Sequence, residues 1–325
     1  MKKFVHFNAR TIDEAVPLLR RYGKKARIIA GGTDLLGVMK DEILPEYPEA
    51  IVNIKTIQGM DFIDEDEGVL KIGALTRLQD IAESAVVQQN FFALAESARK
   101  TGSTHIREMG TIGGNICQDI RCWYYRYPNN RFPCLRKGGG RCYAIEGDNR
   151  YHSIFGGSVE GGCYAVHPSD TAPALIALDA KIKTTKRTVK AENFFSVGVS
   201  KTTILDDDEF VTEIQIPKPP AGTKSAFMKF ARRKSIDFPI VNCAVLLRES
   251  DQKVQNVRIC LNAVYVKPYR PIAAEQAMIG KKLNEPNAEA AADAAVAQAR
   301  PLEHNGYIVQ IAKTLVKRCI LPCSS

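Results

Sequence analysis

Four cysteines within one stretch of the chain are the side chains most able to hold a metal. The 325-residue sequence has nine cysteines, and five of them fall between positions 117 and 163. An odd number in a chain without an export signal argues for reduced thiols rather than a full disulfide framework. Thiolates on one glycine-rich segment can converge on a metal, and soft sulfur ligands select zinc or an iron–sulfur cluster. The four that we interpret as metal ligands are Cys122, Cys134, Cys142 and Cys163.

The ligand type alone leaves zinc and iron open. The spacings contain none of the tight C-x-x-C pairs that are typical of structural zinc ribbons and simple ferredoxins. Four unrelated reduced thiols are the simpler alternative, and the crowding of these cysteines into a segment poor in core-type residues disfavours it. Cys117 is a fifth candidate in the same stretch.

Two glycine-rich loops have the composition of anion-binding sites. The first follows a strand-like run and consists of Ile29, Ala30, Gly31, Gly32, Thr33, Asp34, Leu35 and Leu36. Its glycines let the backbone approach an anion, and Thr33 with the following amides supplies donors at a helix start, which suits a diphosphate. The second loop again combines a hydroxyl, two glycines and an amide, in Thr111, Ile112, Gly113, Gly114 and Asn115.

Each of these loops can equally be a tight structural turn. Together they suggest a ligand with two ends, and a flavin dinucleotide has that shape. Neither loop follows the G-x-G-x-x-G pattern of a Rossmann site, and the chain has no G-x-x-x-x-G-K-[ST] motif for a nucleoside triphosphate.

The sequence pattern predicts the helices and strands that position these residues, and together they form an α+β chain in three parts. Residues 1–55 read as strand, capped helix, strand, short helix and strand. Residues 56–217 continue with strands and helices, interrupted by a long irregular segment over 117–163. A proline-rich run ends this part. Residues 222–325 read as strands followed by alanine-rich helices, which predicts a small antiparallel sheet covered by helices.

The composition favours an ordinary soluble protein. No apolar run approaches the roughly 18 to 20 residues that a membrane span needs, so we expect no membrane span and a cytoplasmic location. The net charge is +9, but the basic residues are scattered and no nucleic-acid motif accompanies them. We therefore expect no nucleic-acid partner and favour a basic face that binds acidic partner subunits. The histidines lack any catalytic or zinc-site spacing, and we assign no catalytic residue.

The order of four motifs resembles that of the FAD-binding subunits in the xanthine dehydrogenase family of molybdenum hydroxylases. The motifs lie at 30–36, 72–74, 111–115 and 169–175, and the match covers essentially the whole chain. The resemblance implies a two-part FAD-binding domain of the vanillyl-alcohol-oxidase-like type, followed by the C-terminal α+β domain. It also implies that the two glycine-rich loops cradle the FAD diphosphate. The further cofactor contacts that it implies are Asp170, Lys229 on the first strand of the C-terminal part, and Thr104.

The cysteine segment resembles an insert that only part of this family carries. In relatives similar to the 4-hydroxybenzoyl-CoA reductase β subunit, and to certain aldehyde oxidoreductase flavin subunits, such an insert binds a 4Fe-4S cluster. The context of Arg121 and Cys122 is similar to those relatives, so the resemblance favours Cys122 over Cys117 as the first ligand. The spacing from Cys142 to Cys163 is longer than in the 4-hydroxybenzoyl-CoA reductase pattern.

The resemblance implies an electron-transfer subunit whose substrate chemistry lies elsewhere. The family places the molybdenum cofactor on a large partner subunit and two 2Fe-2S clusters on a small one. This chain would pass electrons between those clusters and an external carrier, a ferredoxin or NAD. Two other hypotheses stay open: a four-cysteine, zinc-stabilised interaction module without redox activity, and a self-sufficient flavin oxidase. The substrate of the complex and the direction of electron flow are not specified by this sequence.

Overall fold

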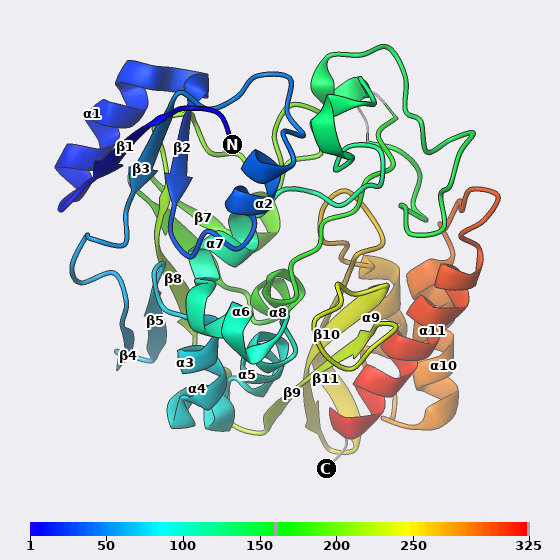
Figure 1. Ribbon diagram of the computed structural model, residues 1–325. Coiled ribbons are helices and arrows are strands. Elements are labelled where there is room, and N and C mark those ends of the chain that lie inside the picture. The colour runs from blue at the N-terminus through cyan, green and yellow to red at the C-terminus, as the bar shows by residue number, and fades with distance from the viewer. Residues whose placement is uncertain (159–161, 324–325) are drawn as a thin grey trace.

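Three separate sheets organise the chain, and helices pack against them (Figure 1). The structure is a computed structural model, and it describes residues 1–158 and 162–323. Its mixture of helices and sheets confirms the predicted α+β class. Across the described residues, no helix is both long enough and apolar enough to cross a membrane.

The first sheet carries the first glycine-rich loop. It is parallel, in the order β1 (Val5–Asn8), β3 (Ala50–Asn53) and β2 (Ala26–Ile29). Helix α1 (Ile12–Tyr22) begins where the Thr11 hydroxyl accepts a hydrogen bond from the Glu14 amide, as its capping residues predict. Strand β2 ends at the loop, and helix α2 (Leu35–Lys40) follows. The loop therefore occupies the carboxyl end of a parallel strand.

The second sheet is antiparallel and supports the second loop. Its order is β4 (Ile63–Asp66), β5 (Val69–Gly73), β8 (Val211–Pro217), β6 (Lys181–Thr184) and β7 (Thr188–Lys190). The helices between its strands are α3 (Leu78–Glu83), α4 (Ala85–Asn90), α5 (Phe92–Arg99), α6 (Thr104–Met109), α7 (Ile112–Cys117) and α8 (Thr171–Ala177).

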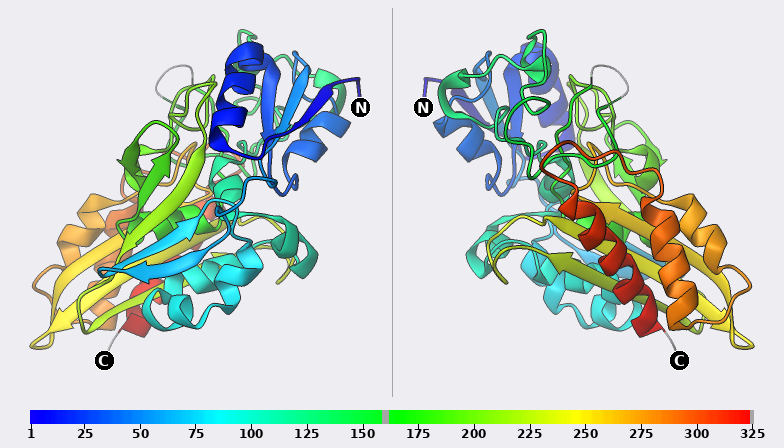
Figure 2. Two further views of the ribbon diagram at one scale, coloured as in Figure 1. Left: turned by 90° about the vertical axis from the view of Figure 1, so that its left-hand side faces the viewer. Right: turned by 90° about the vertical axis from the view of Figure 1, so that its right-hand side faces the viewer.

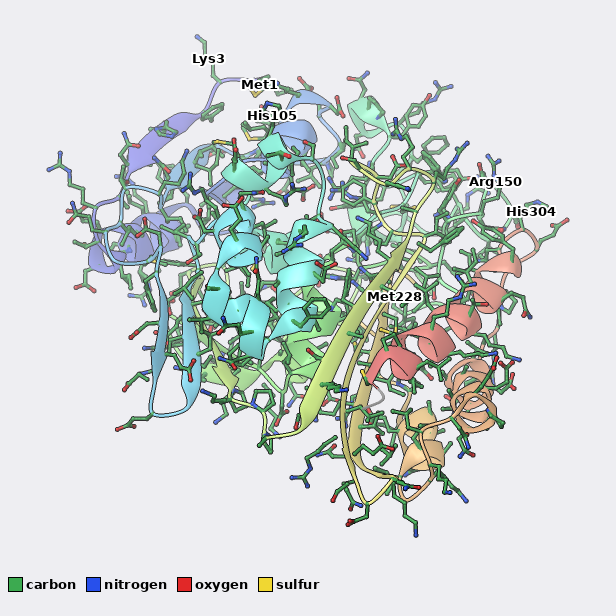
Figure 3. All side chains as sticks on the ribbon, turned by 90° about the horizontal axis from the view of Figure 1, so that it is seen from below. Met1, Lys3, His105, Arg150, Met228 and His304 are labelled. Atoms are coloured by element: carbon green, nitrogen blue, oxygen red, sulfur yellow. The ribbon has the colours of Figure 1, made fainter. Side chains whose placement is uncertain are left out.

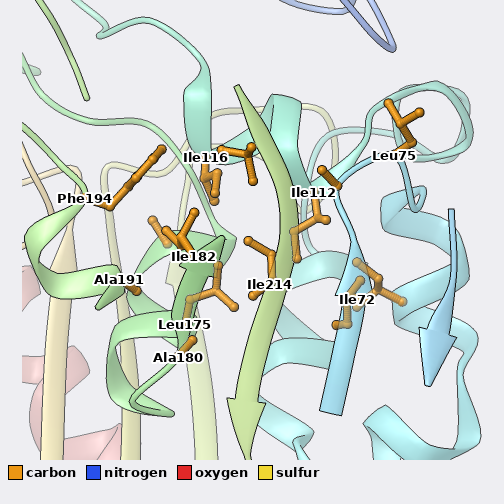
Figure 4. Packing of buried hydrophobic residues seen from close by; sticks show 14 of the residues in the cluster. Ile72, Leu75, Ile112, Ile116, Leu175, Ala180, Ile182, Ala191, Phe194 and Ile214 are labelled. Carbon is orange, nitrogen blue, oxygen red and sulfur yellow. The ribbon is translucent and has the colours of Figure 1, made fainter. Parts of the chain in front are cut away.

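A row of isoleucines joins this sheet to α7. Ile72, Ile214 and Ile182 lie opposite one another on β5, β8 and β6, and all three are fully buried. Ile112 of α7 and Leu175 of α8 belong to the same apolar cluster (Figure 4). Burial of these branched side chains stabilises the packing of both short helices on the sheet. The Gly-Gly-Asn segment, which we expected to be a turn, is therefore the start of a helix.

The third sheet lies between two groups of helices. Its strands β9 (Thr223–Phe230), β10 (Val241–Ser250) and β11 (Lys253–Asn262) run antiparallel in the order β11-β10-β9. Helices α9 (Ile272–Met278), α10 (Glu285–Val296) and α11 (Tyr307–Ile320) stand on one side (Figure 2). Helices α5 and α8 contact its strands as well, so this sheet shares its packing with the second part. The predicted boundaries at 55, 217 and 222 remain a proposal about folding units.

The cysteine-bearing segment between α7 and α8 has almost no regular structure. In its described residues it forms two short 3-10 turns, Pro128–Asn130 and Leu135–Lys137, and an isolated bridge between Arg121 and Val166. Residues 159–161 lie outside the described part. The segment reaches the start of α11, where the His304 amide donates to Asn149 and the Tyr307 hydroxyl donates to the Arg150 carbonyl (Figure 3).

Candidate functional site

The two glycine-rich loops touch each other through Gly31. A Cβ on this residue would lie 2.0 Å from the Met109 carbonyl oxygen, so the backbone of the first loop packs directly on the residues before Thr111. Gly32 has a φ of +72°, which side chains other than glycine rarely adopt. The Thr33 side chain is exposed beside this contact. The structure thus brings together the two loops that the sequence assigned to one ligand.

The other residues of the first loop frame this contact. Ile29 ends β2 and Ala30 follows it, while Leu35 and Leu36 form the first turn of α2. The Leu36 side chain lies beside Gly32, where an added Cβ would be 3.2 Å from it. Thr104 begins α6 with its side chain exposed, and its hydroxyl accepts a hydrogen bond from Arg107 at 3.2 Å.

Each residue of the second loop has a distinct role. The Thr111 hydroxyl accepts a hydrogen bond from the Gly114 amide at 3.2 Å and so begins α7. Gly113 packs against Ala74, because a Cβ there would lie 2.9 Å from the Ala74 carbonyl oxygen. Gly114 is exposed, which leaves its surface open to a ligand.

Asn115 connects the second loop to the Ser-Asp-Thr motif. Its side-chain oxygen accepts hydrogen bonds from the Ser169 hydroxyl at 2.5 Å and from the Thr171 hydroxyl at 2.7 Å. These bonds fix the orientation of the amide. They also hold the start of α8 against α7, so two motifs that lie far apart in the sequence form one unit.

Asp170 and Lys229 form a buried ion pair between the second and third parts. The Lys229 ammonium lies 2.7 Å from the Asp170 carboxylate, and the side chains are 7% and 3% exposed. Asn242 donates a second hydrogen bond to Asp170, and Lys229 also donates to the Lys100 carbonyl. Burial raises the pKa of Asp170, an effect that Lys229 opposes. The structure therefore places both predicted residues together, each as the other's counter-ion.

Asp34 joins the first loop to the cysteine-bearing segment. Its carboxylate accepts hydrogen bonds from Arg121 at 2.9 Å, from Arg126 at 2.8 Å and from the Asp119 amide at 3.0 Å. Burial alone would raise the pKa of Asp34, but Arg126 and Arg121 hold it below its ordinary value. This Asp34 clamp, made with Arg121 and Arg126, was not foreseen from the sequence, where only the Arg-Cys neighbours gave a signal.

The predicted metal ligands influence one another electrostatically. Burial, and to a smaller extent the nearby thiols of Cys163 and Cys142, raise the pKa of the Cys122 thiol to about 12. Cys163 has the same effect on Cys134 and Cys142, after burial. All are free thiols. Among residues 1–158 and 162–323, no group of three or more His, Cys, Asp or Glu side chains is arranged so that it could hold a metal ion.

Backbone amides surround three of these sulfurs in a repeated pattern. Against the dominant effect of burial, the amides two and three residues after Cys122, Cys134 and Cys142 lower the pKa of the preceding thiol in each case. Amides that point at sulfur stabilise thiolates and are one means by which proteins set the potential of iron–sulfur clusters. The donor set thus suits a thiolate-bound cofactor.

Buried His152 and half-buried Arg136 also contact the sulfurs. The Arg136 guanidinium donates to Cys163 at 3.2 Å, and the His152 ring lies 3.2 Å from Cys122. Burial lowers the pKa of His152 to about 4, so this ring is neutral at neutral pH. Neither residue was identified from the sequence.

A basic pocket of about 950 Å³ borders the cysteine segment. Its walls include Cys122 of the cysteine segment, Pro168 just before the Asp170 motif, and Phe238 in the loop that follows β9. One acidic residue, Asp237, lines it. The basic residues of its walls are Arg121, Arg126, Arg150, Arg232 and Arg233.

Comparisons with known proteins agree along the whole chain. The family model described as the FAD binding domain in molybdopterin dehydrogenase matches residues 2–219, and that of the CO dehydrogenase flavoprotein C-terminal domain matches residues 225–323. The chain is 32% identical to the aldehyde oxidoreductase FAD-binding subunit of Escherichia coli, with 96% of each chain covered. It is 29% identical to the carbon monoxide dehydrogenase medium chain of Hydrogenophaga pseudoflava, over 98% of this chain and 96% of the relative.

The fold agrees with these sequence matches. A solved structure of carbon monoxide dehydrogenase from Hydrogenophaga pseudoflava, in a form that lacks the Mo-pyranopterin moiety of its cofactor, superimposes with a TM-score of 0.78 at 28% identity. The match covers 100% of this chain and 99% of that chain.

Proposed function

The chain belongs to the FAD-binding subunits of the molybdenum hydroxylase family, and on that premise we propose that it carries electrons between a bound FAD and a 4Fe-4S cluster. As an oxidoreductase subunit it would leave substrate chemistry to a partner. The observation that carries the proposal is the contact between both sets of cofactor ligands: the Asp34 clamp ties the diphosphate loop to the segment that bears the cysteines.

The FAD site follows a continuous chain of contacts. Gly31 packs on the residues before Thr111, Asn115 holds the Ser-Asp-Thr motif, and Asp170 pairs with Lys229. We assign the diphosphate to the loops 29–36 and 111–115, where exposed glycine backbone and the Thr33 hydroxyl can reach it. Thr104, Asp170 and Lys229 complete the set. When bound, FAD supplies the exchange of electron pairs for single electrons, and the protein supplies its position and surroundings.

The cluster site consists of Cys122, Cys134, Cys142 and Cys163. Four thiols, two buried and two half-buried, three of them met by two successive amides, fit a thiolate-bound cluster. Four cysteines are also a common structural zinc set, so a zinc-stabilised module without redox activity is the competing proposal. Cys122 lines a pocket that Pro168, just before the Asp170 motif, lines as well, which supports electron exchange rather than a purely structural role.

Anaerobic purification with metal analysis and visible and EPR spectra tests this proposal. We expect flavin bands with a broad iron–sulfur shoulder, and about four irons per chain as the 4Fe-4S formula requires. Cys142→Ser should lose the iron signal and keep the flavin bands, whereas the matched variant Cys117→Ser should keep both. One zinc per chain with no iron would establish the interaction module instead.

The partners follow from the family. We propose that the chain is the medium subunit of a complex whose large subunit holds the molybdenum cofactor and whose small subunit holds two 2Fe-2S clusters, in the cytoplasm. The named relative from Hydrogenophaga pseudoflava is itself the medium chain of a carbon monoxide dehydrogenase. For the external carrier we favour an acidic redox protein such as a ferredoxin over NAD, because the pocket beside Cys122 is lined by five arginines.

A further inference from the structure

Arg136 places a half-buried positive charge against one of the proposed cluster ligands. Its Nε donates to the Cys163 sulfur at 3.2 Å. The other guanidinium nitrogens donate to the Val199 and Gly198 carbonyls, at 3.2 and 3.1 Å. Carbonyl oxygens carry no net charge, so the cation has the sulfur as its nearest partner able to become an anion. A side chain held at three points cannot turn away from the cysteine.

Lys137 is a buried cation next to it in the chain. The residue is 9% exposed, and within the described part of the chain its ammonium has no hydrogen-bond partner. It lies over the Tyr125 ring, 5.6 Å from the centroid. Burial lowers its pKa, an effect that the thiols of Cys134 and Cys122 oppose. An unpaired buried ammonium is costly unless a negative charge lies nearby.

We propose that Arg136 and Lys137 are tuning residues of the 4Fe-4S cluster, whose positive charges stabilise the reduced form and raise its reduction potential. The inference rests on the proposed function, because the four thiolates must hold a cluster for these charges to act on it. Uptake of one electron makes the cluster and its thiolates more negative by one charge. Two cations beside it, one of them buried, favour that added charge.

The consequence concerns the direction of electron flow. With a cluster bound, the electron it gains would be one of the pair carried by reduced flavin, and the other would stay on the flavin until a second transfer. A cluster stabilised in its reduced form would accept electrons from flavin readily and would reduce a low-potential carrier poorly. The cationic pair would therefore favour transfer from the flavin to the cluster, and onward transfer only to a carrier of higher potential than the cluster.

An EPR-monitored redox titration of the intact, anaerobically purified complex tests this inference. Lys137→Gln and Arg136→Gln each remove one charge at similar size. We expect each to lower the equilibrium constant for cluster reduction about tenfold, which corresponds to about 59 mV for a one-electron couple. Lys137→Arg keeps the charge and should restore most of the potential. Arg131→Gln removes an exposed cation of the same segment and should leave the midpoint near that of the unmodified protein.

The outcomes separate this inference from the proposed function. If the unmodified complex contains no iron, the cluster proposal itself fails. If the cluster is present and both glutamine variants titrate like Arg131→Gln, the tuning role is wrong while the cluster stands. Should Lys137→Gln fail to assemble the cluster, Arg136→Gln and Lys137→Arg carry the test. A midpoint unchanged in Arg136→Gln then overturns the inference, and a lowered one that Arg136→Lys restores supports it.

Discussion

The two candidate cofactor sites are built in different ways. The loops assigned to FAD stand on sheets and short helices whose apolar side chains are fully buried, such as Ile72 and Ile214. The cysteine segment has two 3-10 turns in its described residues, packs in a smaller apolar cluster that includes Ile120 and Tyr125, and is tied to the first loop by the Asp34 clamp. The first site is therefore shaped by the sheets and helices of the main core before any ligand binds. The second has little regular structure, and it would gain rigidity from a cluster.

The largest expected effect comes from removing the ion pair that joins the second and third parts. Lys229→Met leaves the Asp170 carboxylate 3% exposed without its cation. We expect a loss of about 3 to 5 kcal/mol in the free energy of unfolding, measured by chemical denaturation at neutral pH. The matched variant Lys234→Met removes an exposed lysine and should change stability by less than about 0.5 kcal/mol.

The sign of the pH dependence checks the cause of that loss. Burial already raises the pKa of Asp170, and removal of Lys229 raises it further. A folded state that holds a proton more tightly than the unfolded chain gains relative stability as the pH falls. The deficit of Lys229→Met should therefore shrink on acidification. A deficit that is constant from pH 7 to pH 5 would mean that the carboxylate is not the source of the loss.

The second test separates the two sites from each other. Asp34→Asn leaves Arg121 and Arg126 without their carboxylate, at an expected cost of about 3 kcal/mol. Because the Asp34 clamp holds the cysteine segment, hydrogen exchange should accelerate there and remain slow in β5 and β8. Asp41→Asn, an exposed change at the end of the adjacent helix α2, is the control. Equal acceleration of hydrogen exchange in the cysteine segment and in β5 and β8 would mean that the two sites do not differ in how they are held.

The acid limit of the Asp34 clamp follows from the direction of its pKa. The arginines hold the pKa of Asp34 below its ordinary value in the folded state. Its stabilising contribution is therefore complete above about pH 5, given a reference value of about 3.9, and is lost as the pH falls through the lowered pKa. In Asp34→Asn this part of the acid sensitivity should be absent, which acid titration of the two proteins would show.

The third test concerns packing between the loops. In Gly31→Ala the added Cβ meets the Met109 carbonyl oxygen, so one loop must move, at a cost of about 1 to 3 kcal/mol. Gly37→Ala places the same methyl group in open space on α2 and should stabilise the helix by up to about 1 kcal/mol. We expect FAD affinity, measured by fluorescence titration, to fall only in Gly31→Ala. Unchanged FAD affinity would mean that this loop does not bind the diphosphate.

Local patterns predicted much of the sheet-supported region. The capped helix after Thr11, the strand before Gly31 and the short helix at Leu35 all lie where the sequence placed them. Strands β4 and β8 were not foreseen, because β4 is mostly exposed and β8 carries no turn signal of its own. The Gly-Gly-Asn helix was missed because two glycines disfavour a helix locally, and here burial of Ile112 and the Thr111 cap outweigh them.

The sequence predicted few of the contacts in the cysteine segment. The four cysteines were identified by type and crowding, and their role as metal ligands stays a prediction. Their partners Arg136 and His152 are ordinary residues in a segment without periodicity, so no local pattern distinguishes them. The Asp34 clamp joins residues 87 and 92 positions apart, a distance that no short motif spans.

The smallest expected effect comes from replacing Arg232, which lines the pocket beside Cys122. Arg232→Gln removes an exposed charge from the pocket wall and touches neither the core nor a proposed ligand. If an acidic carrier docks there, electron exchange between the intact complex and a ferredoxin should slow about twofold to fivefold at low ionic strength, because a charge at the rim acts mainly on the association rate. The difference should vanish at high salt, where the Debye length falls to about 3 Å. Arg21→Gln, which removes an exposed charge from α1, should leave the rate unchanged. Equal slowing in both variants would mean that only the net charge of the protein matters. Faster exchange with NAD than with ferredoxin would assign the pocket to a nucleotide. Either result would argue against docking of an acidic carrier at the cysteine segment, the role that distinguishes this segment from the flavin loops.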